Sequence, residues 1–480
     1  MGDPVALLTV ADPEVGLGHL YRIDALAQSL MRFGDATVEL LVSCTAGEGW
    51  LRERKPLSKY HLESWNTTPL VAEELAGSRS IIVVDAYQID RSVWAALTSG
   101  LAQLAVFDDY GEKPPFRGLL INGSPGGNLL HYIEREGQRL LIGPRYQVLR
   151  PAFWQRSNKR VAQELSRILV MAGGTDAAKL GRELATTVLE ATPPRSETLF
   201  VGGGDWNAPG VRHTGFLSAE RLRELMMSAD LLVTPAGQSV AEAVSCALPT
   251  VTVQSAENQR LNALGWAEVG AAQFASVVGA PDWRATLGET VRRLIGFEER
   301  QSLASSAEAL DLANSTERVA SRILGLPEPL RLVRFQDLSR EQLDLVLRWR
   351  NDARVRKWMD HPEPIAQEDH YRFVQGLASR DDAVYYLAYQ YDEPVGVINL
   401  TGIESGEAEL GVYRRPDRSG RGYGELLMRD LEREASFLSV STLKLKVARG
   451  NSPAKSLYQR WGYEVYRQDG RYLYMKKELN

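Results

Sequence analysis

The sequence predicts an α/β protein with parallel sheets in its first two-thirds and a separate α/β domain after a linker. Short apolar runs alternate with helical periodicity, from "VALLTV" at 5–10 to "ADLLVTPAGQSVAEAV" at 229–244. This alternation is typical of parallel strands joined by helices. The prolines in "GLPEPLRL" (325–332) mark the linker. A length of 480 residues fits about three domains of ordinary size.

The composition is that of an ordinary globular protein, with 44% hydrophobic and 24% charged residues. A formal net charge of −5 argues against a general nucleic-acid binder, whose domain is usually basic. The 2 cysteines fit a reducing compartment better than a disulfide framework. The sequence has no apolar run of ~18 residues and no signal-peptide pattern. We therefore expect a cytoplasmic protein that binds neither nucleic acid nor membrane; its oligomeric state stays open.

The first domain, residues 1–155, is predicted to be Rossmann-like. Its buried strands are expected at 5–10, 38–44, 80–87 and 104–110. Between the first two strands, Leu20, Leu26 and Leu30 recur at helical spacing.

The second domain, residues 156–325, repeats this organisation. A strand within 167–176 precedes a helix that carries Leu180 and Leu184 on one face. Residues 282–324 have a polar helical pattern and are expected to pack back on these domains. Two Rossmann-like domains in series predict a cleft between them.

Three loops follow predicted strands and precede predicted helices: Gly16–His19, Gly173–Asp176 and Pro235–Ser239. Ligands of open α/β sheets bind beyond the carboxyl ends of the strands, and helix starts there cradle phosphates. The loops therefore favour a nucleotide or nucleotide-sugar ligand. No "GKS" or "GKT" follows them, which disfavours a P-loop, and the first loop lacks the spacing of a dinucleotide fingerprint.

His19 is one of only 6 histidines and lies where the first glycine loop becomes a helix. A neutral imidazole at this position can take a proton from water. A histidine at a helix start can equally be a structural cap, and the residue alone does not separate the two readings.

Several motifs together resemble the UDP-sugar hydrolase family of pseudaminic acid biosynthesis. They are "GLGHLYR" (16–22), "AGGTD" (172–176), "PAGQSVAEAVSCALPTVTV" (235–253), "ENQ" (257–259), "VVDAY" (83–87), "FDDY" (107–110) and "GPRYQVLRPAF" (143–153). The resemblance covers roughly residues 5–325. It implies the GT-B arrangement of two Rossmann-like domains and release of UDP from UDP-2,4-diacetamido-2,4,6-trideoxy-β-L-altropyranose.

The resemblance also implies site residues. His19 would activate the attacking water, and Glu242 would accept hydrogen bonds from the ribose hydroxyls. Further residues would bind the UDP-sugar: Gly16, Gly18, Arg22, Asp85, Tyr87, Asp109, Gly173, Gly174, Gly237, Gln238, Ser239, Asn258 and Gln259. The family has a small residue where this chain has Gln238, which leaves the sugar nucleotide less defined.

Residues 331–480 carry a different set of motifs. "SGRGYG" (419–424) opens an amphipathic helix, and Asn451, Ala454, Tyr458 and "GY" (462–463) follow at fixed spacing. This layout resembles the GNAT acetyltransferase family, which implies acetyl-CoA as co-substrate. A Ser at position 419 departs from the usual Gln or Arg.

By this resemblance, Tyr458 would protonate the departing CoA thiolate. The residues expected to bind acetyl-CoA are Arg421, Gly422, Tyr423, Gly424 and Asn451. Glu409 is a possible base for the amine. The segment "LVLRWRNDARVRKWM" (345–359) resembles the substrate helices of sugar-nucleotide and ribosomal-protein N-acetyltransferases, so Arg350, Asn351 and Trp358 are expected near the acceptor.

The combined prediction is a bifunctional enzyme. The last domain would acetylate the 4-amine of UDP-4-amino-4,6-dideoxy-N-acetyl-β-L-altrosamine, and the first two would hydrolyse the product to UDP and the free sugar. Two alternatives stay open: a GT-B glycosyltransferase fused to an acetyltransferase of another amino sugar or of protein, and a chain in which one half only binds its ligand. No cluster of ligands at metal-binding spacing is seen in the sequence, so no metal is expected.

Overall fold

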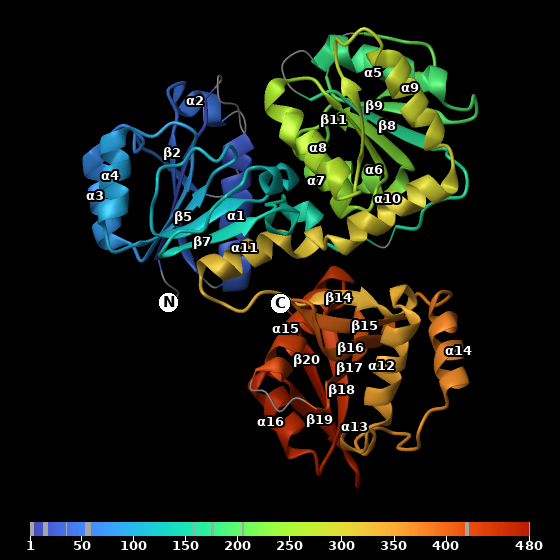
Figure 1. Cartoon of the computed structure of the whole chain (residues 1–480). Coiled ribbons are helices and arrows are strands. Elements are labelled where there is room, and N and C mark those ends of the chain that lie inside the picture. Colours follow the sequence, from blue (N-terminus) through green and yellow to red (C-terminus); the bar gives the residue numbers. More distant parts are fainter. Residues whose placement is uncertain are drawn as a thin grey trace. The chain divides into compact units, whose positions relative to one another are not determined.

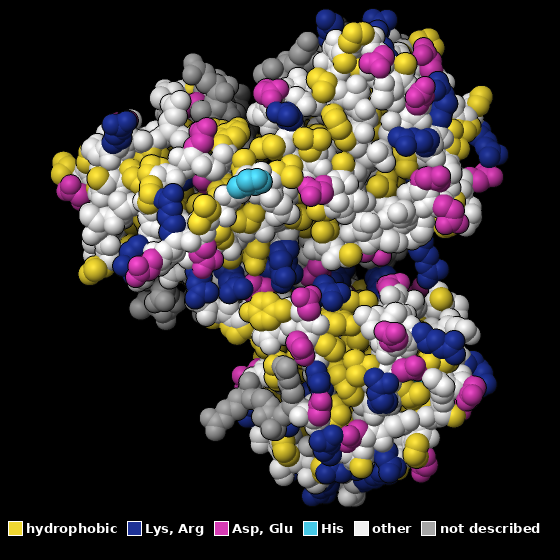
Figure 2. All heavy atoms as spheres, in the orientation of Figure 1, with side chains coloured by type: hydrophobic (Ala, Val, Ile, Leu, Met, Phe, Trp, Pro, Cys, Tyr) yellow, Lys and Arg dark blue, Asp and Glu magenta, His cyan; other side chains and the backbone are white. Residues whose placement is uncertain are grey.

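The computed structural model describes residues 4–12, 18–34, 36–52, 59–157, 159–173, 177–203, 206–417 and 422–479. The chain divides into two compact units, Met1–Leu326 and Pro327–Asn480 (Figure 1). Among the described residues, no helix is both long and apolar enough to cross a lipid bilayer. On the face drawn in Figure 2, charged side chains of both signs are interspersed over each unit.

The first lobe of the first unit contains a 7-stranded sheet with the order β3-β2-β1-β4-β5-β6-β7, and all its strand pairs are parallel. Its strands are β1 (Pro4–Val10), β2 (Thr37–Ser43), β3 (Tyr60–Leu62), β4 (Ile81–Asp85), β5 (Gln103–Phe107), β6 (Gly118–Asn122) and β7 (Gln138–Ile142). The inner strands β1 and β4 are buried on both faces, which explains their continuous apolar runs.

Helices cover both faces of this sheet. They are α1 (Gly18–Gly34), α2 (Gly47–Arg52), α3 (Pro69–Ser78) and α4 (Arg91–Ser99), with 3-10 turns η1 (Pro125–Leu129), η2 (Pro144–Tyr146) and η3 (Pro151–Phe153). α1 buries Leu20, Leu26 and Leu30 in one core, and α3 and α4 contribute to a second core on the other face.

The second lobe contains a 6-stranded parallel sheet with the order β10-β9-β8-β11-β12-β13. Its strands are β8 (Arg167–Met171), β9 (Glu197–Val201), β10 (Val211–His213), β11 (Leu231–Pro235), β12 (Thr250–Gln254) and β13 (Gln273–Val277). Both lobes are parallel α/β sheets, as the sequence predicts, and their strand orders are those of doubly wound folds.

The helices of the second lobe are α5 (Ala177–Ala191), α6 (Ala219–Ser228), α7 (Gln238–Ser245), η4 (Glu257–Gln259), α8 (Arg260–Glu268), α9 (Trp283–Arg293), α10 (Phe297–Ala309), η5 (Leu312–Asn314) and α11 (Ser315–Ile323). α11 returns to the first lobe, where Val319, Ala320 and Ile323 join the core beneath α1 (Figure 1). The expected return of the segment 282–324 is thus confirmed at its end.

The second unit is built on a 7-stranded mixed sheet with the order β14-β15-β16-β17-β18-β20-β19. Its elements are β14 (Arg331–Arg334), η6 (Phe335–Asp337), α12 (Arg340–Asn351), α13 (Ala353–Arg356), α14 (Gln367–Leu377), β15 (Ala383–Gln390), β16 (Glu393–Glu404), β17 (Glu407–Arg414), α15 (Tyr423–Phe437), β18 (Thr442–Ala448), α16 (Ser452–Arg460), β19 (Glu464–Gln468) and β20 (Tyr472–Glu478). The linker ends before β14: Leu330 is buried, and its backbone N–H donates to the Asp430 carboxylate at 3.2 Å.

Candidate active sites

A cavity of about 480 Å³ lies between the two lobes of the first unit. Its volume is in the range of small-molecule sites. Most of the described residues that the sequence predicts for the UDP-sugar line it: Gly18, His19, Arg22, Tyr87, Asp109, Gly237, Gln238, Ser239, Glu242, Asn258 and Gln259. The two lobes thus contribute to one site, as the loop positions predict.

The strand order brings His19 and Asp85 together. β1 and β4 are neighbours, although the two residues are 66 positions apart in the chain. His19 lies in the first turn of α1, the helix that follows β1, and Asp85 is the last residue of β4. Connections leave β1 and β4 in opposite directions at this point of the sheet, and ligands bind at such a switch point.

His19 and Asp85 form a buried pair. The His19 Nδ1 and the Asp85 Oδ1 are 2.6 Å apart, and only 5% of His19 and 1% of Asp85 are exposed. Burial alone would raise the pKa of Asp85, but Arg22 and His19 hold this pKa well below its ordinary value. Because an ionised carboxylate only accepts hydrogen bonds, Nδ1 carries the hydrogen. In the neutral ring Nε2 is then a free acceptor, and no described residue bonds to it.

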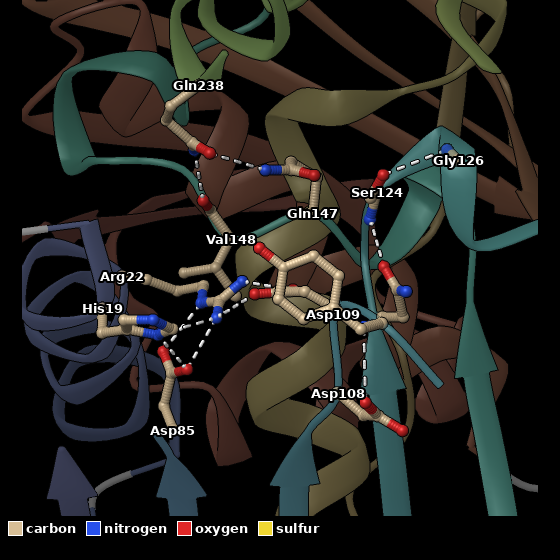
Figure 3. Close-up of polar contacts among 12 residues, drawn as sticks. His19, Arg22, Asp85, Asp108, Asp109, Ser124, Gly126, Gln147, Val148 and Gln238 are labelled. Carbon is tan, nitrogen blue, oxygen red and sulfur yellow. Dashed lines mark hydrogen bonds and ion pairs between the residues drawn. The ribbon is translucent and has the colours of Figure 1, made fainter. Parts of the chain in front are cut away.

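Arg22 links Asp85 to a second carboxylate (Figure 3). Its Nε donates to the Asp85 Oδ2 at 2.7 Å, and its Nη1 donates to the Asp109 Oδ1 at 2.8 Å. The sequence predicts ligand contacts for Asp85, but both its oxygens are taken by His19 and Arg22. The geometry instead makes Asp85 the residue that orients the imidazole. Tyr87 packs its ring against His19, with centroids 4.2 Å apart.

Asp108 fixes the loop that carries Asp109. The Asp108 carboxylate accepts hydrogen bonds from the backbone N–H groups of residues 110–113, at distances from 3.0 to 3.4 Å. Its backbone carbonyl accepts from the Tyr132 hydroxyl at 2.5 Å. Only the second aspartate of "FDDY" is predicted from the sequence to contact a ligand. The signal for the first was its place directly after a buried strand, where acids often cap the following turn.

α7 begins at the wall of the cavity. Its N-cap is Gly237, and the backbone N–H groups of its first turn point beyond the end of β11. The Gln238 side chain does not project freely: it accepts a hydrogen bond from the Gln147 Nε2 at 3.0 Å and donates to the Val148 carbonyl at 3.1 Å (Figure 3). Gln238 thus ties the second lobe to the first.

Glu242 is held by an arginine that the sequence analysis did not select. The Arg150 Nε donates to the Glu242 Oε1 at 2.7 Å across the two lobes. Glu242 is 2% exposed, and its burial raises its pKa although Arg150 acts in the opposite direction. The signal for Arg150 was its place in "GPRYQVLRPAF", where it is a cation in the segment that crosses from the first α/β lobe to the second.

Glycines bring the backbones of the two lobes into contact beside the cavity. A Cβ at Gly126 of η1 would lie 2.6 Å from the Leu261 carbonyl carbon of α8. A Cβ at Gly265 of α8 would lie 2.5 Å from the Gly126 nitrogen. The Ser124 hydroxyl also donates to the Asn262 side chain across this contact.

The remaining predicted residues of this unit are less central. The Gln259 Oε1 accepts from the Ser255 backbone at 2.9 Å, so part of this side chain is used inside its own loop. Gly173 is not among the residues that line the cavity. Gly16 and Gly174 lie outside the described residues. The described residues contain no cluster of histidine, cysteine and carboxylate groups suited to a metal ion.

The second unit has its own cavity, of about 1400 Å³. It opens where β17 and β18 diverge, since the two strands pair only from Glu407 to Glu409. Beyond that point, residues 410–414 of β17 and 446–448 of β18 both line the cavity. Diverging strands leave backbone amides available to an extended ligand with its own amides, which fits the pantetheine arm of coenzyme A.

The glycine loop at one side of this cavity fits a pyrophosphate. Gly422 precedes α15 with a φ of +100°, a conformation that favours glycine, and Gly422 and Gly424 line the cavity. A helix start of this kind attracts anions. Tyr423 packs against the hydrophobic core and is not among the cavity residues. Arg421 lies outside the described residues.

Tyr458 lines the same cavity from α16. It is 8% exposed, and burial raises its pKa to about 12. Its hydroxyl makes no hydrogen bond to a described residue. Asn451 also lines the cavity, but its Oδ1 accepts from the Ala454 backbone at 3.4 Å and caps α16.

The lining of this cavity also includes Arg350 and Trp358, which the sequence predicts near the acceptor, and Glu409, a possible base for the amine. Asn351 does not contribute, because its side chain is engaged twice by the backbone of Ile365, at 2.8 and 2.9 Å. The Asn351 side chain therefore holds the backbone of Ile365, and Asn351 is not among the residues that line the cavity.

Comparisons with known proteins concern the second unit most directly. The model of the acetyltransferase (GNAT) family matches residues 343–463. The acetyltransferase PseH of Campylobacter jejuni subsp. jejuni serotype O:2 is 31% identical over 147 residues, which cover 30% of this chain and 92% of that protein. A crystal structure of C. jejuni N-acetyltransferase PseH in complex with acetyl coenzyme A is 27% identical, covers 32% of this chain and 99% of its own, and has a TM-score of 0.27.

A longer similarity includes both units. An uncharacterized protein of Methanocaldococcus jannaschii is 19% identical over 435 residues, which cover 85% of each chain. The family match confirms the predicted co-substrate, because GNAT enzymes take their acetyl group from acetyl-CoA. With its second unit, the chain belongs to the GNAT acetyltransferase family, alongside PseH.

Proposed function

We propose that the first unit is a UDP-sugar hydrolase in the GT-B arrangement. One observation carries this proposal: the His19–Asp85 pair and the start of α7 line or adjoin the same cavity. A base for water and a cradle for phosphate are the two parts that hydrolysis of a nucleotide sugar needs. The interlobe position of the cavity is what a GT-B enzyme requires.

In the proposed reaction the oxygen of a water molecule attacks C1 of the sugar, and the bond from C1 to the UDP oxygen breaks. His19 Nε2 takes the proton of the attacking water. Asp85 stays ionised and stabilises the imidazolium that forms, as the carboxylate of a catalytic triad does. UDP is a good leaving group, so the reaction needs little acid assistance.

The second unit, in this proposal, acetylates the amine of a UDP-linked amino sugar, and the product is the substrate of the first unit. Acetyl-CoA supplies the acetyl group as a thioester. Tyr458 is protonated at physiological pH, as a tyrosine of ordinary or raised pKa is. It lines the cavity, where it would give its proton to the departing CoA thiolate. The similarity to the acetyltransferase PseH supports acetyl transfer by this unit. The acceptor we propose is the 4-amine of UDP-4-amino-4,6-dideoxy-N-acetyl-β-L-altrosamine.

The pairing of the two units supports consecutive reactions. The acetylated UDP-sugar made by the second unit is the substrate expected for the first. The alignment with the M. jannaschii protein spans 435 residues, more than either unit, so the combination is not peculiar to this chain.

A one-pot assay tests both activities. Purified protein is mixed with acetyl-CoA and the UDP-4-amino sugar, and the products are followed by mass spectrometry and NMR. We expect UDP and free 2,4-diacetamido-2,4,6-trideoxy-L-altrose from the wild type, and acetylated UDP-sugar alone from His19→Ala. An intact acetylated UDP-sugar in the wild-type reaction would overturn the hydrolase; UDP release only after addition of a sugar acceptor would identify a glycosyltransferase. If the UDP-4-amino sugar is not acetylated, the proposed acceptor of the second unit is wrong.

A further inference from the structure

The charges that line the interlobe cavity are nearly all neutralised by one another. Among the described residues, its only lysine or arginine side chains are Arg22 and Arg150. Four of the five N–H groups of Arg22 donate to Asp85 and Asp109, at 2.6 to 2.9 Å. A nucleoside diphosphate that enters this cavity therefore meets one cation that still has most of its donors unused.

That cation is Arg150. Only its Nε has a protein partner among the described residues, the Glu242 Oε1 at 2.7 Å. Its side chain is 33% exposed, and the residue lines the cavity, so Nη1 and Nη2 are accessible to a ligand. A guanidinium can donate through several N–H groups at once in a fixed planar geometry.

Arg150 also lies beside the start of α7. Glu242 is one turn into that helix, and Gln238 at its first position contacts residues 147 and 148 of the segment that carries Arg150. The guanidinium and the free N–H groups of the α7 start thus border the same part of the cavity. Glu242 Oε2 has no hydrogen bond to a described residue, so it stays available while Oε1 is held.

We infer that Arg150 binds the diphosphate of the nucleotide through Nη1 and Nη2 while its Nε holds Glu242 in place for the ribose. This inference rests on the proposed function of the first unit. Arg150 supplies a positive charge that offsets the negative charge growing on the leaving diphosphate. One side chain of the first lobe then orients both the phosphate and the ribose ends of a nucleotide bound to the second lobe.

The test compares UDP with uridine, which lacks the phosphates. Dissociation constants are measured by titration calorimetry for UDP and by ligand-observed NMR for uridine, on the full chain. For Arg150→Met we expect both ligands to bind more weakly, because Glu242 loses the partner that holds it for the ribose. UDP should lose about 10- to 100-fold more affinity than uridine, the loss typical of a charge-assisted hydrogen bond to the diphosphate. Arg150→Lys restores part of the UDP affinity, because it restores charge without the planar donor geometry.

Two matched variants complete the experiment. Glu242→Gln should weaken uridine and UDP by the same factor, because it acts on the ribose. Arg212→Met removes an arginine that is 73% exposed in the same unit and should change neither affinity. Hydrogen exchange of first-unit peptides in each variant reports that the first unit is folded.

The outcomes separate the two hypotheses. If Arg150→Met weakens UDP and uridine equally, or leaves UDP unchanged, the diphosphate role of Arg150 is wrong while the UDP site stands. If the wild-type protein binds neither UDP nor uridine, the proposed function of the first unit is itself wrong.

Discussion

His19 in the first unit and Tyr458 in the second are both buried groups proposed to transfer a proton, but their surroundings differ. His19 is linked to Asp85, Arg22 and Asp109 through hydrogen bonds of 2.6 to 2.9 Å. Tyr458 has no charged partner in the part of the chain that the structure describes, and burial raises its pKa. The first site is organised by charges and the second by exclusion of water.

The difference follows from what each group has to do. A base that accepts a proton becomes a cation, which a nearby carboxylate stabilises. An acid that must remain protonated needs only an environment that disfavours its charged form. A change of one charge should therefore disturb the first site far more than the second.

The largest effect is expected from His19→Ala. Loss of a general base typically costs about 10²- to 10⁴-fold in rate, so UDP release from the acetylated UDP-sugar should fall by this factor. Acetyl transfer by the same protein, measured as release of the CoA thiol, should be unchanged. A variant that hydrolyses at the wild-type rate would remove His19 from the reaction.

Tyr458→Phe tests the second site in the same way. We expect acetyl transfer to fall about 10²-fold, because the departing sulfur loses its proton donor. Tyr463→Phe is the matched control, since this ring lies 6.0 Å from Tyr458 and does not line the cavity. Equal rates for the two variants would contradict the role of Tyr458.

Asp85→Asn tests how far the charged network supports the fold. Removal of one partner from a buried ion pair should cost about 3 kcal/mol of unfolding free energy. The pKa of Asp85 is lowered by folding, so its contribution is complete above the unfolded value of about 3.9 and declines as the pH falls below it.

Hydrogen exchange of first-unit peptides in urea, at pH 7 and pH 3, measures this loss. The difference in unfolding free energy between the wild type and Asp85→Asn should be smaller at pH 3 than at pH 7. Asp109 is the more exposed carboxylate partner of Arg22. Asp109→Asn should therefore lower the unfolding free energy at pH 7 by less than Asp85→Asn does. A gap that widens at low pH would contradict the lowered pKa.

The smallest effect is expected from alkaline pH on acetyl transfer. The pKa of Tyr458 is raised to about 12, so its phenol remains protonated through pH 10. An ordinary tyrosine, with a pKa of about 10, would lose half of its protonated form there. Rates measured from pH 7 to pH 10 under saturating acetyl-CoA should show no decline attributable to Tyr458, and the Tyr458→Phe profile should run parallel.

The sequence predicted elements and loops better than the contacts between them. Polar residues at the ends of apolar runs marked His19 and Asp85 individually. Their pairing depends on β1 lying next to β4, a strand order that local patterns do not specify. Arg150 and Glu242 are 92 positions apart and lie in different lobes, so their ion pair depends on how the lobes dock.

Side chains that serve the fold were the hardest to separate from those expected at a ligand. Asn351 belongs to a segment that resembles a substrate helix, yet it is used to hold the backbone of Ile365. Asn451 caps a helix while it also lines a cavity. An amide side chain fits either use, and only its partners in the folded chain distinguish them.

The glycine contact between η1 and α8 has a consequence for how ligands reach the interlobe cavity. The backbones of the two lobes are in contact at Gly126 and Gly265, so the lobes cannot approach each other further there. Moving the lobes apart would break this contact. The two lobes of the first unit should therefore keep a fixed arrangement and should not open and close around the ligand. Its small-angle scattering profile should barely change when UDP is added, and the rate of nucleotide entry should be set by side-chain rotation at the rim.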